Sequence, residues 1–121
     1  MVEQELKNRT KHYALRVIKL VKALPKTIDG RTIGNQLIRS GTSVGANYRA
    51  VCRARSTAEF ISKLGIVIEE ADESAFWLEI IIESKLVKKE LIERLLKETN
   101  EIVAIMVASM KTIKNKKDNK K

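Results

Sequence analysis

The sequence predicts an all-α protein, an antiparallel up-down four-helix bundle. Apolar residues recur every three or four positions along four long segments. One proline and five glycines in 121 residues are too few turn-formers for an all-β fold. The links between the segments are short, which favours antiparallel neighbours. We assign residues 1–113 to the bundle and residues 114–121, which contain almost no apolar side chain, to a disordered basic tail.

The first predicted helix runs from about Val2 to Leu24 and ends at Pro25, because proline disfavours a helical conformation of the residue before it. The second runs from about Arg31 to Arg55. Its glycines weaken the helix by up to about 1 kcal/mol each, but glycine on a buried face lets another helix approach closely. We therefore expect one helix, with a kink or break near Gly41–Gly45 as the alternative. The expected core residues are Leu6, Tyr13, Val17, Leu20 and Leu24, then Ile33, Leu37, Val44, Tyr48 and Val51.

The third and fourth predicted helices each carry a heptad pattern. The third spans about Thr57 to Ser84, with Ser56 or Thr57 as its N-cap and Glu59 supporting the first turn. The fourth spans about Lys88 to Ile113. Alternating steps of three and four residues predict a buried face on each helix. The positions are Phe60, Leu64, Val67, Ala71, Ser74, Leu78 and Ile81 in the third, and Ile92, Leu95, Thr99, Ile102, Met106, Ser109 and Ile113 in the fourth.

The charge is unevenly distributed along the chain. The formal net charge is +9, of which residues 1–60 carry +8, residues 61–110 carry −4 and the last eleven residues carry +5. A clustered positive excess is typical of a protein with a polyanionic partner. A charge that only maintains solubility is the alternative.

Four arginines of the second helix predict a basic stripe. On a helical projection they fall within an arc of about 80°, opposite the core face, and they extend along about 33 Å of helix. Guanidinium groups suit phosphate oxygens, so we expect the stripe to follow a nucleic-acid backbone, together with cations of the first helix and a nonspecific contribution from Lys111–Lys121. The alternative is a ladder of ion pairs with Glu69, Asp72, Glu79 and Glu83. The expected nucleic-acid-binding residues are Arg31, Arg39, Arg49, Arg53, Lys7, Lys11 and Arg16.

The third helix has a second face that we expect in an oligomer interface. Around residues 76–82 the helix is apolar on nearly all sides, and a monomeric bundle covers only one stripe of each helix. Two glutamates on this face would need a basic partner from a neighbouring subunit. The alternative is that Trp77 packs within its own chain. The expected interface residues are Ile66, Glu70, Glu73, Trp77 and Ile80.

The sequence offers little catalytic or metal-binding chemistry. It has one histidine, one cysteine, no Glu-x-x-His pair and no glycine-rich phosphate loop. We expect no enzymatic activity, no cofactor and no metal. No apolar run reaches about 18 residues, so we expect no membrane span. The polar N-terminal segment lacks a signal core, so we expect a cytoplasmic protein.

The segment Gln36–Tyr48 resembles the signature of the bacterial four-helix-bundle proteins that are encoded in intervening sequences of large-subunit ribosomal RNA genes. That pattern reads approximately Q-[IL]-R-R-[AS]-x-x-S-[IV]-x-A-N. The segments Arg55–Leu64 and Glu70–Glu79 are similar to later family elements, and Leu24-Pro25-Lys26 also fits. The resemblance covers about residues 10–113. Many members continue with I-A-E-G, where this chain has Tyr48-Arg49-Ala50-Val51. The matching positions in the first segment are Gln36, Arg39, Ser43, Val44, Ala46 and Asn47.

The resemblance implies a homopentamer of four-helix bundles arranged as a barrel. It also implies kinship with accessory proteins of diversity-generating retroelements, which bind nucleic acid and a reverse transcriptase through a basic surface. It supplies no catalytic residue. We therefore expect a non-enzymatic homo-oligomer that binds a nucleic-acid backbone, with RNA as the preferred ligand. The alternative is a scaffold that docks an acidic, polymerase-like protein. An enzyme is the more distant rival.

Overall fold

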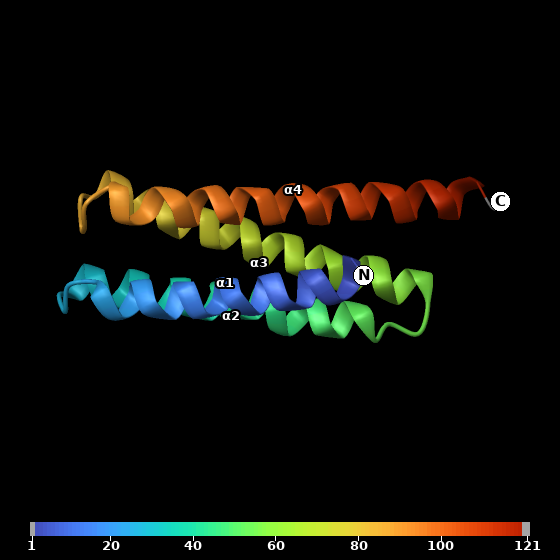
Figure 1. The fold of residues 1–121 in the computed structure, drawn as a ribbon, viewed down its shortest axis with the longest axis horizontal. Coiled ribbons are helices and arrows are strands. Elements are labelled where there is room, and N and C mark those ends of the chain that lie inside the picture. The colour runs from blue at the N-terminus through green and yellow to red at the C-terminus, as the bar shows by residue number, and fades with distance from the viewer. Residues whose placement is uncertain (1, 120–121) are drawn as a thin grey trace.

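The computed structural model describes residues 2–119 and confirms the antiparallel up-down four-helix bundle. The helices are α1 (Val2–Ala23), α2 (Ile28–Cys52), α3 (Thr57–Glu83) and α4 (Glu90–Asn119). α1 and α3 run in one direction, and α2 and α4 run in the other (Figure 1). The α1–α2 and α3–α4 loops therefore lie at one end of the bundle, and the α2–α3 loop lies at the other.

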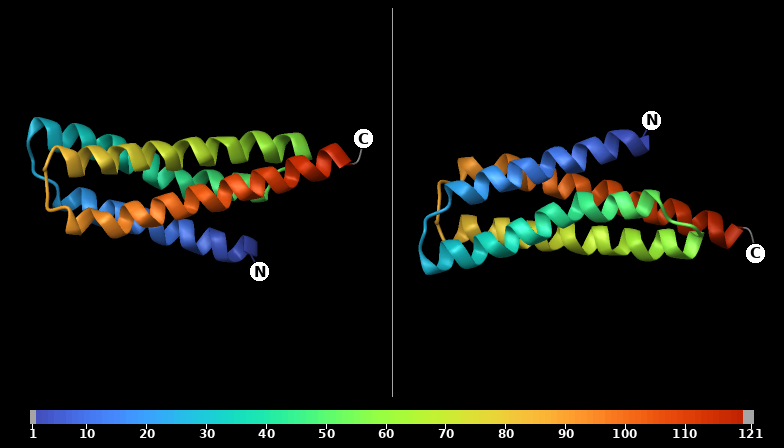
Figure 2. Two further views of the ribbon diagram at one scale, coloured as in Figure 1. Left: turned by 90° about the horizontal axis from the view of Figure 1, so that it is seen from above. Right: turned by 90° about the horizontal axis from the view of Figure 1, so that it is seen from below.

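The helices follow one another around the bundle, so α1 and α3 lie on a diagonal. α2 packs between α1 and α3, and α4 packs mainly on α3. The α1–α4 contact is the least extensive, because α1 diverges from α4 toward its N-terminus (Figure 2). The expected apolar faces form the core: of the positions predicted from periodicity, only Leu20, Phe60, Ser109 and Ile113 are less than fully buried.

Glycines on the α1-facing side let α2 lie close against α1, and α2 runs unbroken through all of them. A Cβ atom placed on Gly41 would lie 2.9 Å from both Cγ atoms of Val17. One on Gly45 would lie 3.3 Å from the carbonyl of Thr10. Close approach therefore accounts for these glycines, and the helix is not broken near Gly41–Gly45.

A layer of buried hydroxyl groups crosses the middle of the core, with one residue from each helix. The Ser74 hydroxyl donates to Ser40 Oγ at 2.9 Å, and Tyr13 Oη lies 2.6 Å from Thr99 Oγ1. All four side chains are almost completely buried, and burial raises the pKa of Tyr13. Because buried hydroxyls need partners, this layer favours one register of the four helices over others.

Predicted boundaries of α2 and α4 are wrong. α2 ends at Cys52 and not near Arg55. α2 begins at Ile28 and not near Arg31, because Thr27 acts as N-cap and its Oγ1 accepts a hydrogen bond from the Gly30 N–H at 3.2 Å. α4 continues through Asn119, so residues 114–119, which we expected to be disordered, are helical. Lysine is a good helix former, and lysines near a helix C-terminus interact favourably with the helix dipole. Residues 120–121 of the expected tail lie outside the described residues.

Candidate nucleic-acid interface

The four arginines of the α2 stripe all have exposed side chains, but they differ in what they contact. Arg31 donates a hydrogen bond to the Lys26 carbonyl oxygen at 2.7 Å. Arg39 is bound by two carboxylates of α3. Arg49 and Arg53 form no ion pair with any described residue. The stripe is therefore divided into an engaged half, Arg31 and Arg39, in the N-terminal part of α2 and a free half, Arg49 and Arg53, at its C-terminal end.

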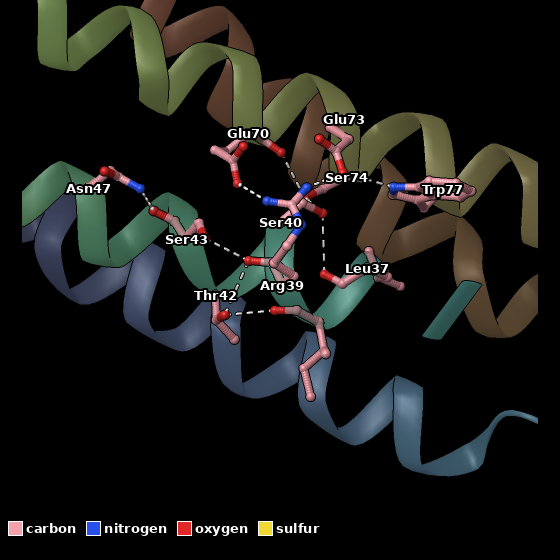
Figure 3. A network of polar contacts seen from close by, with 11 residues as sticks. Leu37, Arg39, Ser40, Thr42, Ser43, Asn47, Glu70, Glu73, Ser74 and Trp77 are labelled. Atoms are coloured by element: carbon pink, nitrogen blue, oxygen red, sulfur yellow. Dashed lines mark hydrogen bonds and ion pairs between the residues drawn. The ribbon is translucent and has the colours of Figure 1, made fainter. Parts of the chain in front are cut away.

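Arg39 is held by Glu70 and Glu73, as Figure 3 shows. Its Nη1 donates to Glu70 Oε2 at 2.9 Å, and its Nη2 donates to Glu73 Oε2. The same Glu73 oxygen accepts from Trp77 Nε1 at 3.1 Å. Hydrogen bonds from Trp77 and Arg39 lower the pKa of Glu73, and the bond to Glu73 raises the pKa of Arg39. The cluster ties α2 to α3.

This cluster corrects two expectations. We expected Glu70 and Glu73 to need a basic partner from a neighbouring subunit, but Arg39 of the same chain supplies it. The alternative was a ladder of ion pairs between these arginines and α3. Arg39 does form such ion pairs, but with carboxylates other than the four named for the ladder. α3 turns Glu70 and Glu73 toward α2, whereas the four carboxylates named for the ladder, Glu69, Asp72, Glu79 and Glu83, are exposed and form no ion pair within residues 2–119.

The free half of the stripe lines a basic groove of about 500 Å³ at the α2–α3 end of the bundle. Its lining is Ala46, Arg49, Ala50, Arg53, Arg55, Glu59 and Lys63, which carries four positive charges and one negative charge. Glu59 Oε1 lies 3.4 Å from Lys63 Nζ, and Glu59 Oε2 accepts a hydrogen bond from the Arg55 backbone N–H at 3.3 Å. The small side chains Ala46 and Ala50 leave room for a phosphate backbone beside the guanidinium groups.

Sequence reasoning missed Arg55 and Lys63. Arg55 was predicted to be the last residue of the second helix, outside the arc of the stripe, but α2 ends at Cys52 and Arg55 lies in the α2–α3 loop. Lys63 lies on α3, whose cations were not considered as part of the basic stripe. Its position four residues after Glu59 and one turn before the core residue Val67 is a signal that could have placed it beside α2.

The three cations predicted on α1 do not join this groove. Lys7 pairs with Glu3 at 3.6 Å. Arg16 is half-buried and lines a separate pocket between α1 and α4. Lys11 is exposed. A further α1 cation, Arg9, forms a two-pronged bond to Glu98 of α4 at 2.6 and 2.8 Å, which lowers the pKa of Glu98.

The predicted interface face of α3 is only partly available. Trp77 is half-buried, packs against the core and makes an edge-to-face contact with Phe76, with ring centroids 5.0 Å apart. Ile80 is also half-buried, and Ile66 is 42% exposed. Phe76, which begins the stretch predicted to be apolar on nearly all sides but was not among the expected interface residues, is 52% exposed. The apolar surface that α3 presents to solvent is therefore turned away from Glu70 and Glu73 toward Phe76.

Residues 2–119 show neither a metal-binding cluster nor a membrane-spanning helix. No group of three or more His, Cys, Asp or Glu side chains is arranged to hold a metal ion. None of the four helices has the length and apolar character needed to cross a membrane.

Comparison with known proteins identifies a family and similar solved structures. Residues 3–108 match the family described as 23S rRNA-intervening sequence protein. A crystal structure of a protein of unknown function from the S23 ribosomal protein family of Bacteroides thetaiotaomicron superposes with a TM-score of 0.84 and 33% sequence identity. The match covers 92% of this chain and 99% of that one. The search of curated proteins found no match.

Proposed function

The chain belongs to the 23S rRNA-intervening sequence protein family. From this we propose that it is a non-enzymatic, homo-oligomeric bundle that binds the backbone of nucleic acid, with RNA as the preferred ligand. The pentameric state implied by the resemblance is part of the proposal. So is a cytoplasmic location.

The observation that carries the proposal is the free half of the α2 stripe. Arg49 and Arg53 are exposed, form no ion pair within the described chain and share a groove with Arg55 and Lys63. Planar guanidinium groups bind phosphate oxygens in a two-pronged manner. No aromatic side chain lines the groove, so base stacking does not contribute there. Binding is therefore directed at the backbone, weakly dependent on sequence and sensitive to salt.

The test is the affinity for a structured RNA hairpin, measured by fluorescence anisotropy at low and moderate salt. Replacing Arg49→Glu together with Arg53→Glu should weaken binding at least about tenfold, because two phosphate contacts become repulsive. Lys88→Glu with Lys97→Glu is the matched control. Both lysines are exposed, neither forms an ion pair within residues 2–119, and the net charge changes equally. The control should lose far less affinity.

Two results would contradict the proposal: no detectable binding by the unmodified protein at low salt, or equal losses in the two variants. Equal losses would mean that net charge alone governs the interaction.

A scaffold that docks an acidic protein is the second candidate. Arginines of this chain already bind carboxylates, as Arg9 with Glu98 and Arg39 with Glu70 show. An acidic, polymerase-like partner could occupy the same groove in place of RNA. Binding of such a partner that survives nuclease treatment and is lost in the Arg49→Glu, Arg53→Glu variant would favour this candidate.

A further inference from the structure

The outer face of α1 carries a stripe of cations and exposed apolar side chains. Lys11, Leu15, Ile18 and Lys22 follow one another at steps of four, three and four residues, so they lie on one side of the helix. Leu15 is 57% exposed, and Ile18 is half-buried. Lys11 and Lys22 are exposed and form no ion pair with a described residue. We call these four residues the α1 outer stripe.

The outer face of α3 carries a stripe of the opposite charge. Asp72, Phe76, Glu79 and Glu83 repeat the same steps of four, three and four residues. Phe76 is 52% exposed, and the half-buried Ile80 adjoins it. The three carboxylates are exposed and form no ion pair within residues 2–119. We call these four residues the α3 outer stripe.

The two stripes match each other in length and in chemistry. Each spans eleven residue steps, about 17 Å of helix. Each has a charged residue at both ends and an exposed large apolar side chain at its second position. Lysines end one stripe and carboxylates end the other. The core-facing sides of α1 and α3 are already used, so the exposed parts of these side chains are not covered by residues 2–119.

The stripes cannot meet within one molecule. α1 and α3 lie on a diagonal of the bundle, so their outer faces point away from each other (Figure 2). Both helices run in the same direction (Figure 1). The α1 outer stripe of one bundle can therefore lie along the α3 outer stripe of a second bundle that stands beside it in a similar orientation.

We propose that the α1 outer stripe of each copy packs against the α3 outer stripe of the next copy. This contact uses two different surfaces, so it repeats from copy to copy and gives a ring when the rotation between copies closes. Leu15 and Ile18 cover Phe76 and Ile80, and the lysines meet the carboxylates at the edges. The inference rests on the proposed homo-oligomer, for which it names both contact surfaces. It also assigns Lys11 to the subunit contact rather than to the phosphate-binding surface.

The test is a charge exchange between the stripes, followed by sedimentation velocity and light scattering without nucleic acid. One variant carries Lys11→Glu and Lys22→Glu, and the other carries Asp72→Lys and Glu83→Lys. Either alone should fall to the 13.7 kDa protomer, because like charges then face each other across the contact. All four substitutions in one chain should restore the assembly, because every contact then again joins opposite charges. Lys88→Glu with Lys97→Glu is the control that should remain assembled.

The possible failures point to different parts of the account. An unmodified protein that sediments as a protomer contradicts the proposed homo-oligomer and with it this inference. An unmodified oligomer whose mass neither variant changes, or whose mass the exchanged charges do not restore, overturns the inference alone. All substituted residues are exposed, so circular dichroism should show unchanged helix content in every variant. RNA binding through Arg49 and Arg53 is measured separately.

Discussion

The two halves of the α2 arginine stripe lie on the same helix face but meet different neighbours on α3. Near the middle of the bundle, Glu70 and Glu73 face α2 and bind Arg39. Toward the α2–α3 loop, the lining of the groove shared by Arg49 and Arg53 contains Lys63 and one carboxylate, Glu59, which already pairs with that lysine. Identical side chains therefore act in one half as a tie between helices and in the other as unpaired cations.

The comparison shows that a count of basic residues overstates a binding surface. An arginine that already has two carboxylate partners offers little to a phosphate, because those partners must first be displaced. The number of stripe arginines that are available to bind phosphate therefore depends on the acidic residues of α3. For this chain, that places the expected phosphate contacts at one end of the bundle rather than along its whole length.

The largest effect on RNA binding should come from releasing Arg39 from its two carboxylate partners. Glu70→Gln with Glu73→Gln keeps the side-chain shapes but removes both negative charges, so Arg39 becomes an unpaired cation like Arg49. RNA affinity should rise several-fold, and the plot of log affinity against log salt should become steeper by about one. Anisotropy titrations over a salt series measure both quantities. An unchanged slope would mean that Arg39 lies outside the phosphate path.

A smaller effect should appear in the pH dependence of the stability that the Glu73 hydrogen bonds contribute. Bonds from Trp77 and Arg39 lower the pKa of Glu73 below its usual range. They therefore stabilise the fold at pH values above the ordinary glutamate pKa, and this stabilisation is lost as the pH falls through the lowered pKa. Glu73 is 35% exposed, so screening keeps the contribution below about 1 kcal/mol. The unmodified protein should melt at a higher temperature than Glu73→Gln at pH 6, and the difference should close as the pH falls through the lowered pKa of Glu73. A difference that does not vary with pH would contradict the assignment.

Most of the fold could be predicted because periodicity reports directly on which face of a helix is buried. Ala71, Leu78 and Ile102 were placed in the core on spacing alone, and all are fully buried. The errors lie at helix ends. Thr27 caps α2 through a bond to Gly30 that apolar spacing does not register, and the lysines after Ile113 continue α4 because loss of apolar residues alone does not end a helix.

The site was less predictable because pairing depends on how neighbouring helices are rotated about their axes. Glu69 and Glu70 are adjacent in sequence but about 100° apart around α3. Periodicity places the buried face but does not give the rotation of α3 relative to α2 closely enough to choose between such neighbours. The stripe itself was found, whereas its partners, and the contributions of Arg55 and Lys63 to the groove, required the packed helices.

The salt dependence of RNA binding tests most directly whether the stripe is divided. Each phosphate-contacting cation contributes about 0.9 to the slope of log affinity against log salt on a duplex. Arg49→Gln with Arg53→Gln should therefore reduce the slope by about two, whereas Arg39→Gln should leave it unchanged. A slope that falls with Arg39→Gln, or that stays the same without Arg49 and Arg53, would contradict the account.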